Sequence, residues 1–193
     1  MRSMRIAAVV AALVVVGVAG SVSVPAQARW GRHCAARLEP VGAKDRHGVI
    51  SARAVDIGCF PTFAEALFAG SGGAVRVPAG TTPAGLTRRL LAASSTAAPT
   101  VRLIGTEFTG FAYGADSRSY FAPTACAGGD VWELSYVGEA WNDVFESGKG
   151  FGGCDRNRKF AAAGFTGGSV LCTPNCPDYG VLDMEVSSLR WRP

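Results

Sequence analysis

Short apolar runs recur through the C-terminal half of the chain, and they are rich in β-branched and aromatic residues. Gly, Asn, Asp and Pro separate these runs, a pattern typical of strands joined by turns. No convincing helical period accompanies them. The pattern predicts an all-β unit over residues 100–193, with strands at residues 101–104, 120–121, 131–137, 159–160, 169–172 and 187–191.

The part before residue 100 carries a helical signal. Thr62 and Glu65 have the spacing of a capping box, in which each side chain binds a backbone N–H of the other residue. Gly-Ser-Gly-Gly at residues 70–73 ends the helix. Apolar residues at helical spacing predict its buried stripe, namely Phe63, Leu67 and Phe68.

Further short elements are predicted between this helix and residue 100. Residues 74–77 are a strand candidate, and Thr82-Pro83 can cap a second helix. The buried stripe of that helix would be Leu86, Leu90 and Leu91. Small and polar residues at 92–100 indicate a linker. We therefore expect residues 29–99 to form a small α/β accessory segment before the β domain.

The first 28 residues have the three parts of a secretory signal peptide. Arg2 and Arg5 give a positive start, residues 6–20 are uncharged and apolar, and Ala26-Gln27-Ala28 supplies a cleavage pattern. The apolar run is shorter than the roughly 20 residues that span a bilayer. We expect the mature chain to begin at about Arg29, to be extracellular and to make no membrane contact after cleavage.

All six cysteines lie after the predicted cleavage point. An even number in an exported chain predicts three disulfides, among 15 possible pairings. Zinc binding is the alternative, but the spacing offers no Cys-x-x-Cys pair, and His33 and His47 are far from the later cysteines. Following chain order and domain, we predict the pairs Cys34–Cys59, Cys126–Cys154 and Cys172–Cys176.

The net charge of +4 hides an asymmetry. Residues 29–99 hold nine basic and four acidic side chains, whereas residues 100–193 hold eight basic and eleven acidic ones. The arginines of the basic part are spread out and are not clustered with aromatic residues, so we expect no nucleic-acid partner. We expect a monomer.

A catalytic function is not predicted. Both histidines lie before residue 100, outside the β domain, and the cysteines are expected to be oxidised. Gly70-Ser71-Gly72 lacks the strand–serine–helix context of a hydrolase nucleophile. The chain is therefore expected not to be an enzyme.

The β domain contains a repeat. Leu103 stands five positions before Phe108-Thr109-Gly110, and Phe160 stands five positions before Phe165-Thr166-Gly167. Each copy ends in a polar loop that closes on serine, at Ser147 and at Ser188. Two similar β units of this length suggest duplicated Greek keys in one sandwich.

This repeat resembles the Greek-key signature of the βγ-crystallin family: an aromatic residue, four residues, an aromatic residue, one residue, then glycine. Phe160, Phe165 and Gly167 match it fully. The other copy has Leu103 in the first aromatic place, before Phe108 and Gly110. Glycine there permits a positive φ in the folded hairpin, which the aromatic pair covers. The resemblance implies a double Greek-key β-sandwich over residues 100–193.

The calcium-binding members of that family carry a loop of two Asn/Asp residues, two variable residues, Ser/Thr and Ser. Residues 142–147 match at Asn142 and Asp143, but Glu146 replaces the hydroxyl residue. Residues 183–188 match at Asp183, Ser187 and Ser188, but Met184 replaces the second Asn/Asp. Hard cations need several oxygen ligands, so each departure from the motif is expected to weaken a site, although Glu146 could still offer oxygen.

The family shares ligands between its two motifs. That implies one weak Ca²⁺ site from Asp143 and Ser187, and one damaged site where Met184 and Glu146 meet. The candidate metal ligands are Asn142, Asp143, Glu146, Asp183 and Ser187. The alternative is that both loops are simple turns in which Asp and Ser bind the backbone.

The whole layout also resembles secreted actinobacterial proteins, some of them grouped with the metalloprotease inhibitors of Streptomyces. This implies an alternative function, inhibition of an extracellular protease through a rigid loop. The candidate loop is Thr173-Pro174-Asn175, closed by Cys172 and Cys176. The same residues could equally be a stapled turn between strands.

Overall fold

The computed structural model describes residues 33–95 and 100–193. The predicted signal peptide, residues 1–28, and residues 96–99 of the predicted linker lie outside the described residues. The described part contains two α-helices, α1 (Phe63–Gly70) and α2 (Arg88–Ala93). Its strands are β1 (His33–Pro40), β2 (Val49–Phe60), β3 (Arg102–Gly110), β4 (Gly114–Ala122), β5 (Val131–Leu134), β6 (Ser147–Gly150), β7 (Arg156–Ala162), β8 (Thr166–Cys172) and β9 (Ser188–Arg192).

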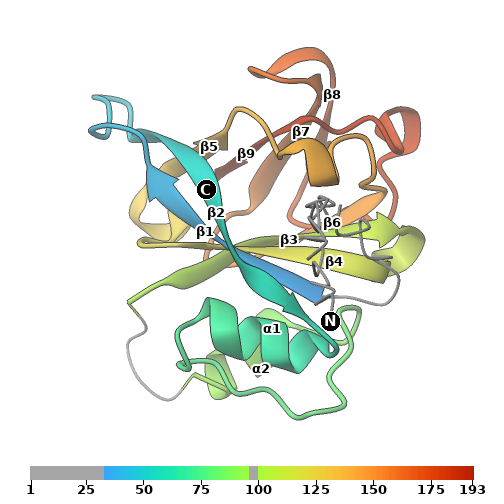
Figure 1. The fold of residues 1–193 in the computed structure, drawn as a ribbon. Coiled ribbons are helices and arrows are strands. Elements are labelled where there is room, and N and C mark those ends of the chain that lie inside the picture. The colour runs from blue at the N-terminus through green and yellow to red at the C-terminus, as the bar shows by residue number, and fades with distance from the viewer. Residues whose placement is uncertain (1–32, 96–99) are drawn as a thin grey trace, which may run out of the picture.

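The nine strands form one continuous sheet in the order β6-β3-β4-β1-β2-β5-β9-β7-β8. In Figure 1, β3, β4 and β6 lie in one layer, and β5, β7, β8 and β9 lie above it. The main core draws on both layers, with Tyr120, Trp132, Leu189 and Trp191 buried together. The prediction of a mainly β protein is confirmed.

Two three-stranded units repeat with the same register. In the first unit, Phe108 of β3 faces Ser117 of β4 and Ser147 of β6. In the second, Phe160 of β7 faces Ser169 of β8 and Ser188 of β9. Phe108 and Phe160 are therefore equivalent positions.

The expected sequence repeat is out of register by five residues. It aligned Phe108 with Phe165 and gave Gly110 a positive φ, but Gly110 is extended at φ −149°. The structural equivalent of Phe165 is Tyr113: their φ values are 65° and 68°, and each ring packs edge-on against the preceding phenylalanine. The tripeptide Phe-Thr-Gly therefore repeats in the sequence but occupies different structural positions in the two units. The hairpin requires a particular backbone conformation, which does not depend on that tripeptide.

The corrected first copy is Phe108, Tyr113 and Ala115. Ala115 stands at the place of Gly167, and both have a positive φ, at 58° and 74°. An alanine in the left-handed region costs roughly 1–2 kcal/mol. The sequence could not reveal this copy because Ala115 stands where the expected motif has a glycine.

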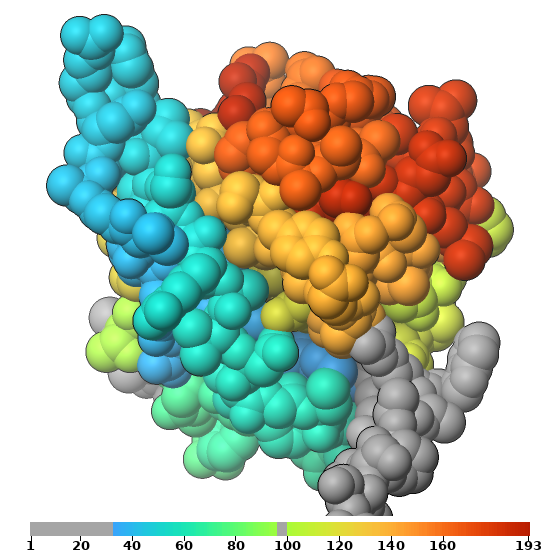
Figure 2. Space-filling model, turned by 45° about the horizontal axis from the view of Figure 1, so that its top comes forward, coloured from blue at the N-terminus to red at the C-terminus, as the bar shows by residue number. Residues whose placement is uncertain are grey.

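The hairpin of β1 and β2 joins the two layers. β1 runs parallel to β4, and β2 runs parallel to β5, so residues before the predicted linker complete the sheet of the β domain. The tip of the hairpin, residues 41–48, projects from the body (Figures 1 and 2). The sequence of β1 has no alternating pattern because the strand is buried on both faces. Ala35 lies in the cluster with Phe63 and Leu67 of α1, whereas Ala36 and Leu38 enter the main core.

Helix α1 begins as predicted. Thr62 and Glu65 form the capping box, and Phe63 and Leu67 are buried against β1 and β4, whereas Phe68 is 38% exposed. The predicted strand at 74–77 is reduced to one bridge between Val75 and Ser95.

The second helix starts later than predicted. Thr87 caps α2, accepting a hydrogen bond from the Leu90 amide at 3.1 Å. Thr82 instead closes a turn by accepting from the Gly85 amide. Leu86 is buried, but Leu90 and Leu91 are partly exposed. The six predicted C-terminal strands fall on β3, β4, β5, β7, β8 and β9; β6 was missed because Ser-Gly-Lys-Gly has no apolar residue.

All three predicted disulfides are present. Cys34–Cys59 joins β1 to β2, Cys126–Cys154 links the segment after β4 to the start of β7, and Cys172–Cys176 closes the five-residue loop after β8. The described part of the chain has no free cysteine.

Candidate functional site

The two polar loops predicted to bind calcium lie side by side. The Asp143 amide donates to the Val186 carbonyl, and the Met184 amide donates to the Phe145 carbonyl. Asp143 and Met184 both have φ 56°. These reciprocal bonds show that residues 142–147 and 183–188 are equivalent loops. Each loop belongs to one of the two repeated units.

Asp143 and Ser187 come together across the loops, as predicted from sequence. The Ser187 hydroxyl lies 3.4 Å from Asp143 Oδ1 and also donates to the Ala161 carbonyl at 3.0 Å. The Asn142 amide donates to Asp143 Oδ2 at 2.6 Å. A carboxylate, a hydroxyl and an amide thus share one small volume at the surface.

The second pairing of loop residues is less favourable to a cation. Glu146 occupies the place equivalent to Ser187, and Met184 the place equivalent to Asp143. Burial raises the pKa of Glu146, and the nearby negative charge of Asp183 raises it further. Met184 is 54% exposed and provides a thioether where a hard cation needs oxygen.

One side-chain oxygen in each loop is buried without a hydrogen-bond donor among the described residues. These atoms are Oδ1 of Asn142 and Oδ1 of Asp183, which hold equivalent positions. A buried oxygen without a donor is costly, and a cation would satisfy it. Among residues 33–95 and 100–193, no three His, Cys, Asp or Glu side chains are grouped to hold a metal. At Asp143 the structure instead brings together one carboxylate, the Ser187 hydroxyl and the Ala161 carbonyl.

The serines that close the loops have a structural role. Ser147 accepts from the Tyr113 amide and donates to the Gly110 carbonyl, and Ser188 does the same with Phe165 and Ala162. Each serine therefore holds the folded hairpin of its unit. This arrangement leaves their hydroxyls committed to the backbone.

The loop Thr173-Pro174-Asn175 lies against β6. The Pro174 carbonyl accepts from the Gly150 amide and the Asn157 side chain, and Cys176 exchanges two backbone hydrogen bonds with Gly148. An inhibitory loop needs a free extended backbone to pair with a protease. These contacts therefore favour the stapled turn, the other reading of this segment.

The structure contains a buried charged cluster that the sequence did not predict. Glu107 of β3 and Lys159 of β7 form an ion pair with side-chain exposures of 0% and 1%, and the Tyr179 hydroxyl donates to Glu107. Burial lowers the pKa of Lys159, although Glu107 opposes this. Because the two residues are 52 positions apart, no local spacing could have indicated the pair.

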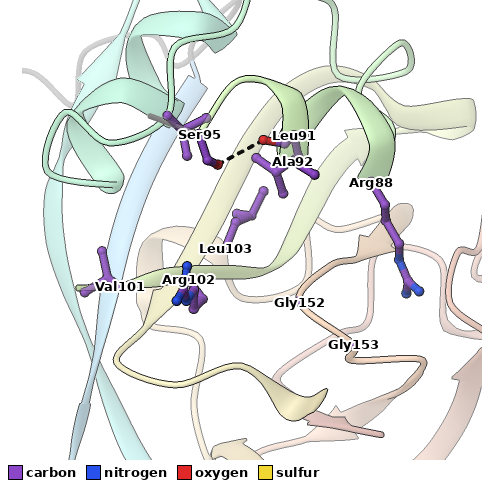
Figure 3. A pocket seen from close by; sticks show the side chains of 10 residues that line it. Arg88, Leu91, Ala92, Ser95, Val101, Arg102, Leu103, Gly152 and Gly153 are labelled. Carbon is purple, nitrogen blue, oxygen red and sulfur yellow. Dashed lines mark hydrogen bonds between the residues drawn. The ribbon is translucent and has the colours of Figure 1, made fainter. Parts of the chain in front are cut away.

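A pocket of about 290 Å³ lies between α2 and the start of β3 (Figure 3). Its lining includes Leu91, Val101 and Leu103, with Arg88 at one side. Arg88 pairs with Asp155. Ser95 and Val101 also line the pocket, and the residues between them in the sequence are not all described, so we assign the pocket no role.

Comparisons with known proteins do not assign this chain to a family. No family model matches the chain, and no curated protein matches it. Among solved structures, the N-terminal domain of protein S matches 46% of this chain and 93% of its own, at 18% identity and a TM-score of 0.35. Within the described residues, no helix is both long and apolar enough to cross a bilayer.

Proposed function

We propose that the chain is a secreted βγ-crystallin-type module with two Greek-key motifs, and that it binds Ca²⁺ weakly at the Asp143–Ser187 site. The contact between Asp143 and Ser187 carries this proposal. Two residues 44 positions apart, in equivalent loops, supply oxygen atoms to one place. A simple turn would need no such contact between loops.

Two further points support calcium over the simple-turn alternative. Asn142 Oδ1 is buried without a donor among the described residues. Carboxylate, amide, hydroxyl and carbonyl oxygens together are the ligands that Ca²⁺ takes in proteins.

The expected affinity is low. The site offers one carboxylate, and extracellular Ca²⁺ modules work at dissociation constants of about 10⁻⁴–10⁻³ M. A cation that binds the folded state alone stabilises it by about 1.4 kcal/mol at ten times the dissociation constant. The function of the ion in this proposal is therefore stabilisation of the folded module.

The second loop pair is expected to bind more weakly or not at all. Glu146 can offer oxygen, but Met184 removes the ligand equivalent to Asp143. One ion per chain is the stoichiometry that follows from these residues.

Export is part of the proposal. Three disulfides are the pattern of a chain that matures outside the cytosol. Free Ca²⁺ is plentiful there, so a weak site could fill. The inhibitor alternative has no observation in its favour and we do not carry it further.

Thermal melting of the mature chain tests the proposal. The protein starting at Arg29, with its disulfides formed, is melted in EDTA, in millimolar Mg²⁺ and in millimolar Ca²⁺. We expect Ca²⁺ to raise the melting temperature by a few degrees and Mg²⁺ to raise it less, because Mg²⁺ tolerates irregular sites poorly. Equal melting temperatures in Ca²⁺ and EDTA would overturn the proposed ion binding.

A further inference from the structure

Four arginines face one another across strands β7 and β9. The antiparallel register places Arg156 opposite Arg192, and Arg158 opposite Arg190. Their neighbours Asn157, Lys159, Leu189 and Trp191 are buried, so the arginines occupy the outer face of the sheet. We call these four residues the arginine ladder.

The ladder holds a local excess of positive charge. Glu133 of β5 pairs with Arg190 at 2.5 Å, and Arg190 also lies over the rings of Phe160 and Phe165. Arg158 donates to the Ser169 hydroxyl at 3.0 Å. No ion pair of Arg156, Arg158 or Arg192 occurs among the described residues. The ladder therefore carries about three unneutralised charges within a half that is acidic overall.

This arrangement is unfavourable for the isolated protein. Like charges directly opposite on neighbouring strands destabilise a sheet, and Arg156 and Arg192 form such a pair. In the adjacent pair, Glu133 neutralises Arg190, and Arg158 keeps its charge. Burial lowers the pKa of Arg192, and the charges of Arg156, Arg158 and Arg190 lower it further. A bound anion would remove this repulsion.

We propose that the arginine ladder is a docking surface for a linear polyanion whose phosphate groups recur along its chain. Arginine pairs along a strand are about 6.7 Å apart, and the two members of a pair lie about 5 Å apart across the strands. A tetrahedral phosphate offers oxygens to both guanidinium groups of a pair, whereas one guanidinium can occupy both oxygens of a carboxylate.

The shape of the surface selects an extended ligand. The ladder lies on the outer face of paired strands, away from the pocket beside α2, whose lining includes none of the four arginines. The two rings beside it, Phe160 and Phe165, are covered by Arg190. Nucleic-acid surfaces add aromatic platforms for stacked bases, which this surface does not offer. A phosphate polymer without bases fits it best.

Binding of labelled inorganic polyphosphate to the mature chain tests the proposal. We expect binding at low ionic strength whose affinity falls steeply with salt. The double variant Arg156→Gln/Arg192→Gln should lose at least about tenfold in affinity and lower the salt slope by about two. The matched control, Arg46→Gln/Arg53→Gln, removes the same charge from the exposed β1–β2 hairpin and should change the affinity less than about threefold.

Stability gives a second readout that needs no ligand. Arg192→Gln removes like-charge repulsion, so we expect a higher melting temperature at low salt and no difference at high salt. A lower melting temperature at low salt would contradict the repulsion on which the proposal depends.

Four results in the binding assay would overturn the docking surface. They are no polyphosphate binding at low salt, equal losses in the ladder and control variants, tighter binding of oligo-dT or poly-glutamate than of polyphosphate, and preferential binding to anionic phospholipid vesicles. The first two reject a specific surface, and the others identify a different class of partner.

Discussion

Glu107 and Lys159 occupy equivalent positions in the two repeated units and form an ion pair with each other at the centre of the molecule. Glu107 faces Gly148 of β6, and Lys159 faces Leu189 of β9, in the same register. The two units thus carry opposite charges at equivalent positions where they meet. The Tyr179 hydroxyl donates to the same carboxylate.

Breaking this pair should destabilise the fold strongly. Lys159→Met leaves the Glu107 carboxylate buried without its cation, and we expect a loss of about 3–5 kcal/mol in the free energy of unfolding. Glu107→Leu should cost a similar amount. The triple variant Glu107→Leu/Lys159→Met/Tyr179→Phe removes every buried polar partner and should lose much less than the sum of the singles. Denaturant titration measures the parent chain, the triple variant and its three single variants, Tyr179→Phe included; additive losses would show that the charges are not coupled.

The corrected repeat predicts opposite effects at Ala115 and Gly167. Ala115→Gly relieves a left-handed alanine and should raise the free energy of unfolding by up to about 1 kcal/mol. Gly167→Ala introduces the same strain into the other hairpin and should lower it by 1 kcal/mol or more, roughly. Thermal melting of both variants distinguishes this register from one centred on Gly110, in which Ala115→Gly would be neutral or destabilising.

Glu146 should make the calcium-free protein less stable as the pH rises. Its pKa in the folded state is raised, first by burial and then by Asp183. The folded state therefore binds more protons than the unfolded state at pH values just above 4.5, and the free energy of unfolding falls as the pH rises through that window.

Replacing Glu146 isolates this effect. Glu146→Gln should be more stable than the parent chain near neutral pH in EDTA, and the difference should vanish below about pH 4. Glu185→Gln, an exposed change in the partner loop, serves as the control and should track the parent chain. Denaturation curves from pH 3 to 7 make the comparison; parallel curves for Glu146→Gln and the parent would contradict it.

Each disulfide should contribute to the free energy of unfolding according to the length of the loop that it closes. Cys126–Cys154 spans 28 positions and Cys172–Cys176 spans four. Chain entropy alone gives contributions of about 3.6 and 2 kcal/mol. The pair Cys126→Ala/Cys154→Ala should thus lose more stability than Cys172→Ala/Cys176→Ala, measured by denaturant unfolding. The reverse order would mean that the short loop is needed to hold β6.

Sequence reasoning recovered what short-range chemistry dictates. The capping box of Thr62 and Glu65 is a contact over three residues, and three disulfides followed from an even number of cysteines in a chain expected to be exported. The contact between Asp143 and Ser187 could be predicted because the family resemblance implied that the two loops share ligands. Local pattern and resemblance together were therefore enough to predict the main β unit and the contact between Asp143 and Ser187. The role of these two residues as metal ligands stays a prediction.

What escaped prediction depends on long-range pairing. β1 has no alternation because both of its faces are buried, and β6 has no apolar side chain at all. The arginine ladder joins residues more than 30 positions apart, so the overall charge of residues 100–193 gives no sign of it. Tyr113 and Ala115 were overlooked because their positive φ values contradict what those residue types usually adopt.

Calorimetric titration with Ca²⁺ tests the central claim most directly. The mature chain should take up one ion per molecule at a dissociation constant of about 10⁻⁴–10⁻³ M. Asp143→Asn keeps the side-chain shape and tolerates a positive φ, yet should weaken binding at least tenfold, roughly, because it removes the one charged ligand. Met184→Asp supplies the missing ligand of the second loop and should raise the stoichiometry to two. No heat from the parent chain in millimolar Ca²⁺, or unchanged binding in Asp143→Asn, would contradict the account.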